Sequence, residues 1–201
     1  MSGPLVLACG ALVTELRAVL SASGLDQIVE VRYLPANLHN RPEQIVPALR
    51  ALLDEHDPHR DRHVAIAYAD CGTGGGLDAW LATEPGIERL PGAHCYELFA
   101  GSALFHELHD AQPGTFYLTD FLAKHFDALV WSGLGLDRHP QLRDTYFGNY
   151  TRLVLVSQSD DPAVAAAAIA AADRLGLAFE HRHVGLDPFG DAVGVLVRSA
   201  A

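Results

Sequence analysis

The sequence predicts a single α/β domain over residues 1–201, with a doubly wound, mostly parallel sheet of about five to six strands and helices on both faces. Short apolar runs alternate with helical patterns along the chain, which is typical of parallel βα units. The run at residues 63–69 is apolar almost throughout, as expected of a strand buried on both faces. No internal repeat or linker in the sequence indicates a second domain.

The composition disfavours disordered, nucleic-acid-binding, secreted and membrane proteins. The 201 residues are 49 % apolar, which predicts a folded chain with one sizeable core. The formal net charge is −11 and no run of Lys or Arg occurs, so we expect no nucleic-acid partner. The apolar run 5–9 is too short for a signal peptide, and no stretch reaches the roughly 18 apolar residues of a membrane helix. Three widely separated cysteines disfavour disulfides, so the expected location is the cytoplasm, with no membrane partner.

The elements follow from local patterns. A first strand at 5–8 leads into a helix at 12–21 that ends near Gly24, and Pro42 is well placed to begin a later helix. The remaining strands are expected at 28–33, 63–69, 95–99, 128–131, 152–156 and 178–183, and the remaining helices from about 77, at 102–110, at 119–126 and at 162–175.

Cysteine and histidine residues fall where such a sheet binds ligands, outside the carboxyl ends of its strands. Cys9 closes the first strand, His39 lies in the loop after the second, and Cys71 closes the third. Cys95, beside His94, falls in the predicted fourth strand and needs a local bend to join them. Three thiolates with His39 or His94 as the fourth ligand would complete a tetrahedral zinc site.

The residue types leave alternatives open. Three protein ligands with an open position would make a catalytic zinc that lowers the pKa of a bound thiol or water, and three thiolates could instead hold an iron–sulfur cluster. No CxxC pair is present to choose among them. Without a metal, one cysteine could be a nucleophile, with Cys95 beside His94 as the candidate. The cysteines could also be small buried apolar residues.

A glycine-rich loop follows the third strand. Gly72, Thr73, Gly74 and Gly75 precede a predicted helix, so their backbone N–H groups could bind a small anionic substrate, with Asp70 as a catalytic residue beside them. The loop matches neither the P-loop pattern nor GxGxxG, so a nucleotide is not expected. The alternative is a tight turn that needs positive φ.

A second loop, at residues 131–140, combines charged residues with turn residues after a predicted strand. Arg138 could bind a substrate carboxylate and His139 could transfer a proton, or Arg138 could simply pair with Asp137. His106 and His109 lack the HExxH order and are expected on a solvated helix face.

Six segments together resemble an uncharacterised bacterial and archaeal family, the domain of unknown function numbered 1638. They are LACGAL (7–12), LHNRP (38–42), DCGTGG (70–75), HCYE (94–97), GTFYLTDF (114–121) and GLDRHP (135–140). The resemblance implies a link to corrinoid-dependent one-carbon metabolism. A zinc-thiolate site would then serve methyl transfer to or from a small molecule, with a corrinoid or methyltransferase protein as partner.

Asn40, directly after His39, and Glu97, two residues after Cys95, are further expected substrate-binding residues. The competing class is a non-enzymatic accessory protein that binds a metal or a corrinoid. A closed site of four ligands without a pocket would favour this class over a metal-dependent methyltransferase.

Overall fold

The computed structural model describes residues 3–199 and confirms the α/β class. The strands form two parallel sheets, of four and three strands, in place of the one predicted sheet. The chain divides into two compact units, the first containing the described residues up to Leu98 and from Pro188 onward, the second Phe99–Asp187. The single-domain prediction stays a prediction, and residues 1–2 and 200–201, which it includes, lie outside the described part.

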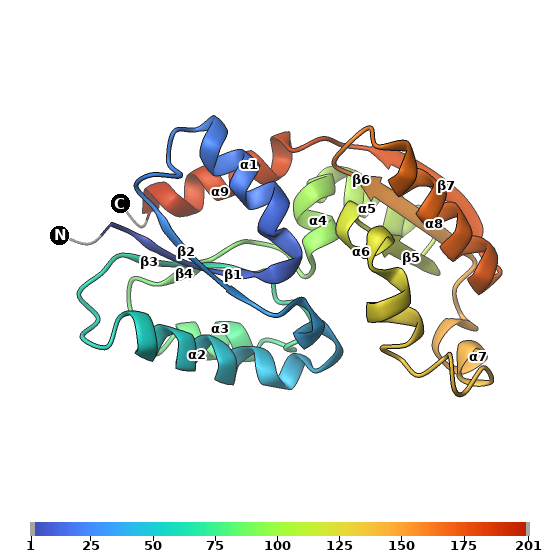
Figure 1. Ribbon diagram of the computed structural model, residues 1–201, viewed down its shortest axis with the longest axis horizontal. Coiled ribbons are helices and arrows are strands. Elements are labelled where there is room, and N and C mark those ends of the chain that lie inside the picture. The colour runs from blue at the N-terminus through green and yellow to red at the C-terminus, as the bar shows by residue number, and fades with distance from the viewer. Residues whose placement is uncertain (1–2, 200–201) are drawn as a thin grey trace. The chain divides into compact units, whose positions relative to one another are not determined.

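The first unit is a parallel sheet with helices on both faces. Its strand order is β2-β1-β3-β4. The strands are β1 (Leu5–Cys9), β2 (Glu30–Leu34), β3 (Val64–Ala67) and β4 (Glu88–Arg89). The helices α1 (Val13–Ala22) and α9 (Asp187–Ser199) cover one face, and α2 (Ile45–His56) and α3 (Gly76–Leu81) cover the other (Figure 1). Both central strands are therefore buried along their whole length.

Helix α2 shows why the sequence folds in this way. Ile45, Leu49 and Leu53 recur every four residues and are fully buried, so one apolar stripe faces the sheet. Short 3₁₀ turns connect the elements at the carboxyl ends of β1 and β2. They are η1 (Gly10–Leu12), η2 (Ala36–Asn40) and η3 (Pro42–Gln44).

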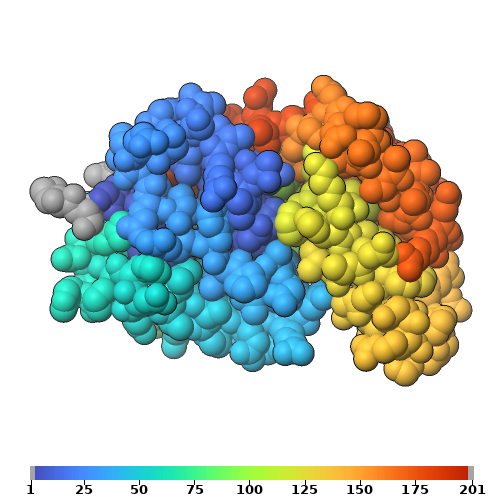
Figure 2. Space-filling view, viewed as in Figure 1, coloured from blue at the N-terminus to red at the C-terminus, as the bar shows by residue number. Residues whose placement is uncertain are grey.

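The second unit is a three-stranded parallel sheet of order β5-β6-β7. The strands are β5 (Thr115–Leu118), β6 (Arg152–Ser157) and β7 (Ala178–His183). The helices are α4 (Cys95–Ala100), which begins in the first unit, α5 (Ser102–Ala111), α6 (Asp120–Lys124), the π-helical turn η4 (Asp127–Trp131), α7 (Leu142–Phe147) and α8 (Pro162–Leu175). Residues 119–147 and α8 form the face of this unit that is turned toward the viewer in Figure 2.

Several predicted elements are confirmed and two are wrong. The helix at 162–175 and the strand at 178–183 occur at the predicted residues, because Asp161 caps the helix and Gly176 ends it at positive φ. The strand predicted at 95–99 is helix α4, and the one predicted at 128–131 is the turn η4. No helix in the described part of the chain is long and apolar enough to cross a membrane.

Side-chain contacts explain both errors. Glu97 accepts a hydrogen bond from the Ala93 N–H at 2.8 Å, which caps the start of α4 and overrides the apolar strand-like pattern. In η4 the Arg174 guanidinium lies 3.8 Å from the centre of the Trp131 ring and also pairs with Asp127. The Arg174 contacts join residues 47 positions apart, so they are not readable from a local sequence pattern, whereas the Glu97 contact is local and was not recognised.

Candidate functional site

Three cysteines and one histidine gather in the first unit, at the carboxyl end of its sheet. Cys9 ends β1, Cys71 follows β3, Cys95 begins α4 and His39 lies in η2. All three cysteines are buried and free. The charges of Cys9 and Cys71 act on both His39 and Cys95, so the four side chains form one group, which we call the thiol cluster.

Cys9 and His39 are in contact. The Cys9 sulfur lies 3.9 Å from His39 Nδ1 and 4.0 Å from Nε2, and it accepts a hydrogen bond from the Ala11 N–H at 3.3 Å. Gly10 makes this approach feasible, because a Cβ there would lie 2.6 Å from the Leu34 carbonyl oxygen. The chain after β1 therefore passes directly against the end of β2, which leads into η2.

The imidazole of His39 is held in a defined orientation. Its Nδ1–H donates to the Ala36 carbonyl oxygen at 2.9 Å, which leaves Nε2 for the sulfurs. Burial alone would lower the pKa of His39, but hydrogen bonding to Cys71 and Cys9 and the charges of both sulfurs raise it to about 11. In the metal-free protein a proton on His39 therefore lies beside the two sulfurs.

Cys71 has an unusual backbone. Its φ is 51°, and among the described residues other than glycine only Arg60 shares a positive φ. This region costs an L-residue about 1–2 kcal/mol relative to the ordinary helical region. The Cys71 N–H donates to the Ala93 carbonyl at 2.8 Å, so the start of the glycine-rich loop is hydrogen-bonded to the segment before Cys95. Strained residues of this kind concentrate at functional sites.

Tyr68 is a member of the site that sequence reasoning missed. It is fully buried, its ring is stacked with that of His39 at 6.4 Å, and its hydroxyl has no hydrogen-bond partner in the described part of the chain. Burial, followed by Cys9 and Cys71, raises the pKa of Tyr68 above its ordinary value. A tyrosine in an apolar strand carries no sequence signal beyond its place near the strand's carboxyl end.

Cys95 and His94 do not have the properties expected of a nucleophile and its base. Burial and then the charges of Cys71 and Cys9 raise the pKa of the Cys95 thiol well above its ordinary value, the opposite of what a reactive thiol needs. The His94 ring is stacked on Tyr96 at 4.8 Å, and burial lowers the pKa of His94. Of the two predicted fourth ligands, His39 contacts a cysteine sulfur, that of Cys9.

One pair within the thiol cluster, Cys9 and His39, lies close to the separation that a shared metal ion would require. No three His, Cys, Asp or Glu side chains among residues 3–199 are arranged to hold a metal ion as they stand. In a tetrahedral zinc site, Zn–S and Zn–N bonds of about 2.3 and 2.05 Å separate sulfur from nitrogen by about 3.6 Å. The separations between Cys9 and His39 are 3.9 and 4.0 Å, so this pair needs to close by only a few tenths of an ångström.

The glycine-rich loop is closed by its own aspartate. The Asp70 carboxylate accepts hydrogen bonds from the Thr73 hydroxyl and from the N–H groups of Gly74 and Gly75, both at 3.1 Å. Partial burial would raise the pKa of Asp70, but these hydrogen bonds hold it below its ordinary value. The Gly74 and Gly75 N–H groups expected to bind a substrate anion therefore already bind a carboxylate, while Gly72 has φ 83° and lies against Pro42.

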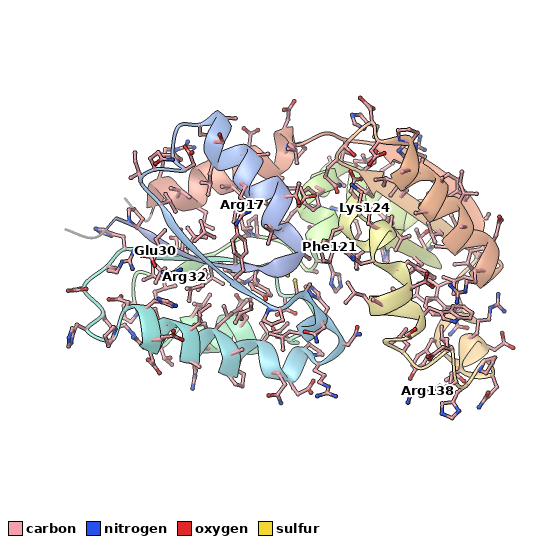
Figure 3. The ribbon with its side chains drawn as sticks, in the orientation of Figure 1. Arg17, Glu30, Arg32, Phe121, Lys124 and Arg138 are labelled. Atoms are coloured by element: carbon pink, nitrogen blue, oxygen red, sulfur yellow. The ribbon has the colours of Figure 1, made fainter. Side chains whose placement is uncertain are left out.

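The other predicted site residues are dispersed. Glu97 caps α4, and Asn40 is exposed at the end of η2, directly after His39. Arg138 is an exposed residue of the second unit (Figure 3), and His139 beside it is also exposed. The Arg138 guanidinium lies 3.8 Å from the Asp137 carboxylate, which is the alternative contact expected from the sequence.

A pocket of about 390 Å³ lies elsewhere in the first unit, between α1 and β2. Its polar lining comes from Ser21, Asp26, Tyr33 and Arg17, the last of which is labelled in Figure 3. The Arg17 guanidinium lies 5.9 Å from the centre of the Tyr33 ring. No cysteine lines this pocket. The thiol cluster therefore does not open into it.

The fold and the thiol cluster define an α/β protein with three buried cysteines and a partly buried histidine at the carboxyl end of a parallel sheet. The chain belongs to the family described as "Protein of unknown function (DUF1638)", whose model matches residues 33–193. A search of curated proteins and a search of solved structures each gave no significant match.

Proposed function

We propose that this protein binds one thiophilic metal ion, zinc first, through Cys9, Cys71, Cys95 and His39. The observation that carries the proposal is the contact between Cys9 and His39, 4.0 Å from the sulfur to Nε2, inside a group that also contains Cys71 and Cys95. Soft thiolates with one imidazole are the donor set that zinc prefers in tetrahedral sites.

The electrostatics of the thiol cluster support a bound cation. Burial first, and then the charges of Cys71 and Cys9, raise the pKa of Cys95, so a negative charge on this sulfur is unfavourable without a cation. In the metal-free protein the proton of His39 supplies the compensating positive charge. A zinc ion would replace that proton at Nε2, while Nδ1–H keeps its hydrogen bond to the Ala36 carbonyl, as ligating histidines commonly do.

The burial of the thiol cluster favours a closed site over a catalytic one. Four protein ligands leave no open position for a substrate, and the three cysteines are each at most 9 % exposed. The proposed role is therefore that of a metal-binding protein, with the ion stabilising the first unit or awaiting transfer. Metal-dependent methyl transfer with Asp70, Arg138 and His139 stays a prediction, and Asp70 already has its oxygens engaged in the loop.

Metal and acid-labile sulfide content per chain, measured on protein purified without a histidine tag, tests the proposal. We expect about one zinc per chain and no sulfide. The Cys71→Ser and His39→Gln variants should lose the zinc, and the matched variant His94→Gln should keep it. Iron with equimolar sulfide would show that the protein holds an iron–sulfur cluster and not zinc. Absence of metal after anaerobic preparation with zinc and iron supplied would overturn metal binding altogether.

The second candidate function is a metal-free thiolate. The same Cys9–His39 contact could hold an ion pair between a thiolate and an imidazolium, as in enzymes with a cysteine nucleophile. Alkylation of metal-free protein distinguishes this function. A nucleophilic Cys9 would react faster than Cys71 and Cys95 at neutral pH, and His39→Gln would remove the difference.

A further inference from the structure

Two histidines and a serine meet at the carboxyl end of the second unit's sheet. His181 Nε2 lies 2.8 Å and His183 Nδ1 lies 3.1 Å from the Ser157 hydroxyl oxygen. Ser157 ends β6, His183 ends β7, and the two residues are paired in register. Parallel sheets bind their ligands at this end of the strands.

The alternation of a strand puts both rings on one side. His181 and His183 are two residues apart, so they share a face of the sheet. Helix α8 packs on this side of the sheet, because Leu155, the register partner of His181, lies in the same core cluster as Val164 of α8, but the two histidines themselves stay exposed. Arg182 lies on the opposite face, where its guanidinium pairs with Glu180 at 2.6 Å. Its positive charge therefore does not oppose a cation between the histidines.

The surroundings supply oxygen as well as nitrogen donors. Ser157 is 1 % exposed, so its hydroxyl oxygen is a fixed, buried group beneath the two rings. His181 and His183 are exposed on the edge strand β7, which leaves them open to solvent. The exposed Asp160 carboxylate lies 3.5 Å from His183 Nδ1 at the rim.

We propose that His181 and His183 bind a divalent transition-metal ion, with the Ser157 and Asp160 oxygens beside it. Imidazole nitrogens suit Zn²⁺, Ni²⁺, Cu²⁺ and Co²⁺, and bind them better than they bind Mg²⁺ or Ca²⁺. No three His, Cys, Asp or Glu side chains of the described chain converge here, so the remaining coordination positions of the bound ion would be filled by water. The site is thus exchangeable and independent of the thiol cluster, whose ligands all belong to the first unit.

Cobalt titration of the full chain, by equilibrium dialysis and absorption spectroscopy, tests this proposal. Thiolate-bound Co²⁺ gives an intense sulfur-to-metal charge-transfer band, which histidine-bound Co²⁺ lacks. We expect one equivalent with the band and a second without it. The double variant His181→Asn/His183→Asn should weaken binding of the second equivalent by more than about tenfold and keep the band. His181→Asn alone should weaken it in the same direction.

The matched control is His106→Asn/His109→Asn, which removes two other exposed histidines of the same unit. It should leave the second equivalent unchanged. The proposal is overturned if no second equivalent binds, if the control abolishes it, or if it survives in the His181→Asn/His183→Asn protein. Loss of the charge-transfer band alone would contradict the thiol cluster as a metal site and leave the histidine site standing.

Discussion

At the scale of single residues, the backbone of Cys71 is the clearest sign that the thiol cluster is more than a group of small core residues. Its φ of 51° is a region that glycine adopts freely and other residues do not. A cysteine at such a position indicates that its side chain, and not its backbone preference, determines the residue type. The flanking Gly72 and Gly74 have positive φ at no such cost.

The first prediction concerns this backbone. In the metal-free protein, Cys71→Gly should be more stable than Cys71→Ala by about 1 kcal/mol, because alanine is strained at positive φ. Cys95, the first residue of α4, is the control, and there the order should reverse, because glycine is the poorer helix residue. Urea unfolding of the four variants measures both differences. Equal stability of the two Cys71 variants would contradict the strain.

The second prediction concerns the pH dependence of stability. The folded protein raises the pKa of His39 from 6.5 to about 11 through Cys71 and Cys9, against the lowering effect of burial. The stabilisation is therefore complete below pH 6.5 and is lost as the pH rises toward 11, where the folded state also releases the proton.

Over that window the free energy of unfolding of metal-free wild type should fall with pH more steeply than that of His39→Gln. Urea unfolding at a series of pH values measures the two slopes. His59→Gln removes an exposed histidine of the same unit and should retain the wild-type slope. Identical slopes for wild type and His39→Gln would show that His39 has no charged partner in the folded protein.

At the scale of elements, the sequence was informative where apolar periodicity and capping residues coincide. Helix α8 begins at Pro162 after a capping Asp161 and ends at Gly176, and all three signals are local. Helix α4 was predicted as a strand because its own residues resemble a short strand, and the capping contact of Glu97 with the Ala93 amide was not recognised. Cys95 consequently reaches the thiol cluster from the start of a helix.

The candidate site was likewise only partly predictable. The position of Cys9, His39 and Cys71 after three parallel strands follows from topology, and their grouping needs no more than that rule. The roles of Tyr68 and of the His181–His183 pair depend on which side chains face them across the fold. Such contacts leave no pattern in a single sequence.

The third prediction concerns the turn between β1 and η1. Gly10→Ala should destabilise the protein by about 1–3 kcal/mol, because its Cβ would meet the Leu34 carbonyl at 2.6 Å and the backbone must shift. Gly76→Ala is the matched control, since its Cβ would meet only Thr73 at 3.7 Å, an ordinary contact. Thermal or urea unfolding compares the two. If Gly10→Ala is as stable as Gly76→Ala, the close approach that carries Cys9 toward His39 does not exist.

At the scale of the whole molecule, the chain leaves the first unit after Leu98 and returns to it at Pro188. Helix α9 completes the first unit from the far end of the sequence, and Gly190 lies against Val19 of α1. All four proposed zinc ligands belong to this unit. The first unit therefore depends on residues nearly a hundred positions after Cys95, the last cysteine in the sequence. Local sequence patterns do not predict contacts over such a separation.

The fourth prediction tests this dependence. Phe189 of α9 is fully buried, so Phe189→Ala should lower the free energy of unfolding by about 3–5 kcal/mol. Val195→Ala on the same helix removes a side chain that is 60 % exposed, and its effect should stay within about 0.5 kcal/mol. Urea unfolding with zinc chelated measures both. Similar small effects for the two variants would mean that α9 does not contribute to the core.

The most direct test of the central claim is X-ray absorption spectroscopy at the zinc edge, on untagged protein loaded with one equivalent of zinc. The proposed ligands predict about three sulfur atoms at about 2.3 Å and one nitrogen at about 2.0–2.1 Å from the metal. A shell of nitrogen and oxygen alone would contradict the thiol cluster as the zinc site and would assign that zinc to groups such as His181 and His183.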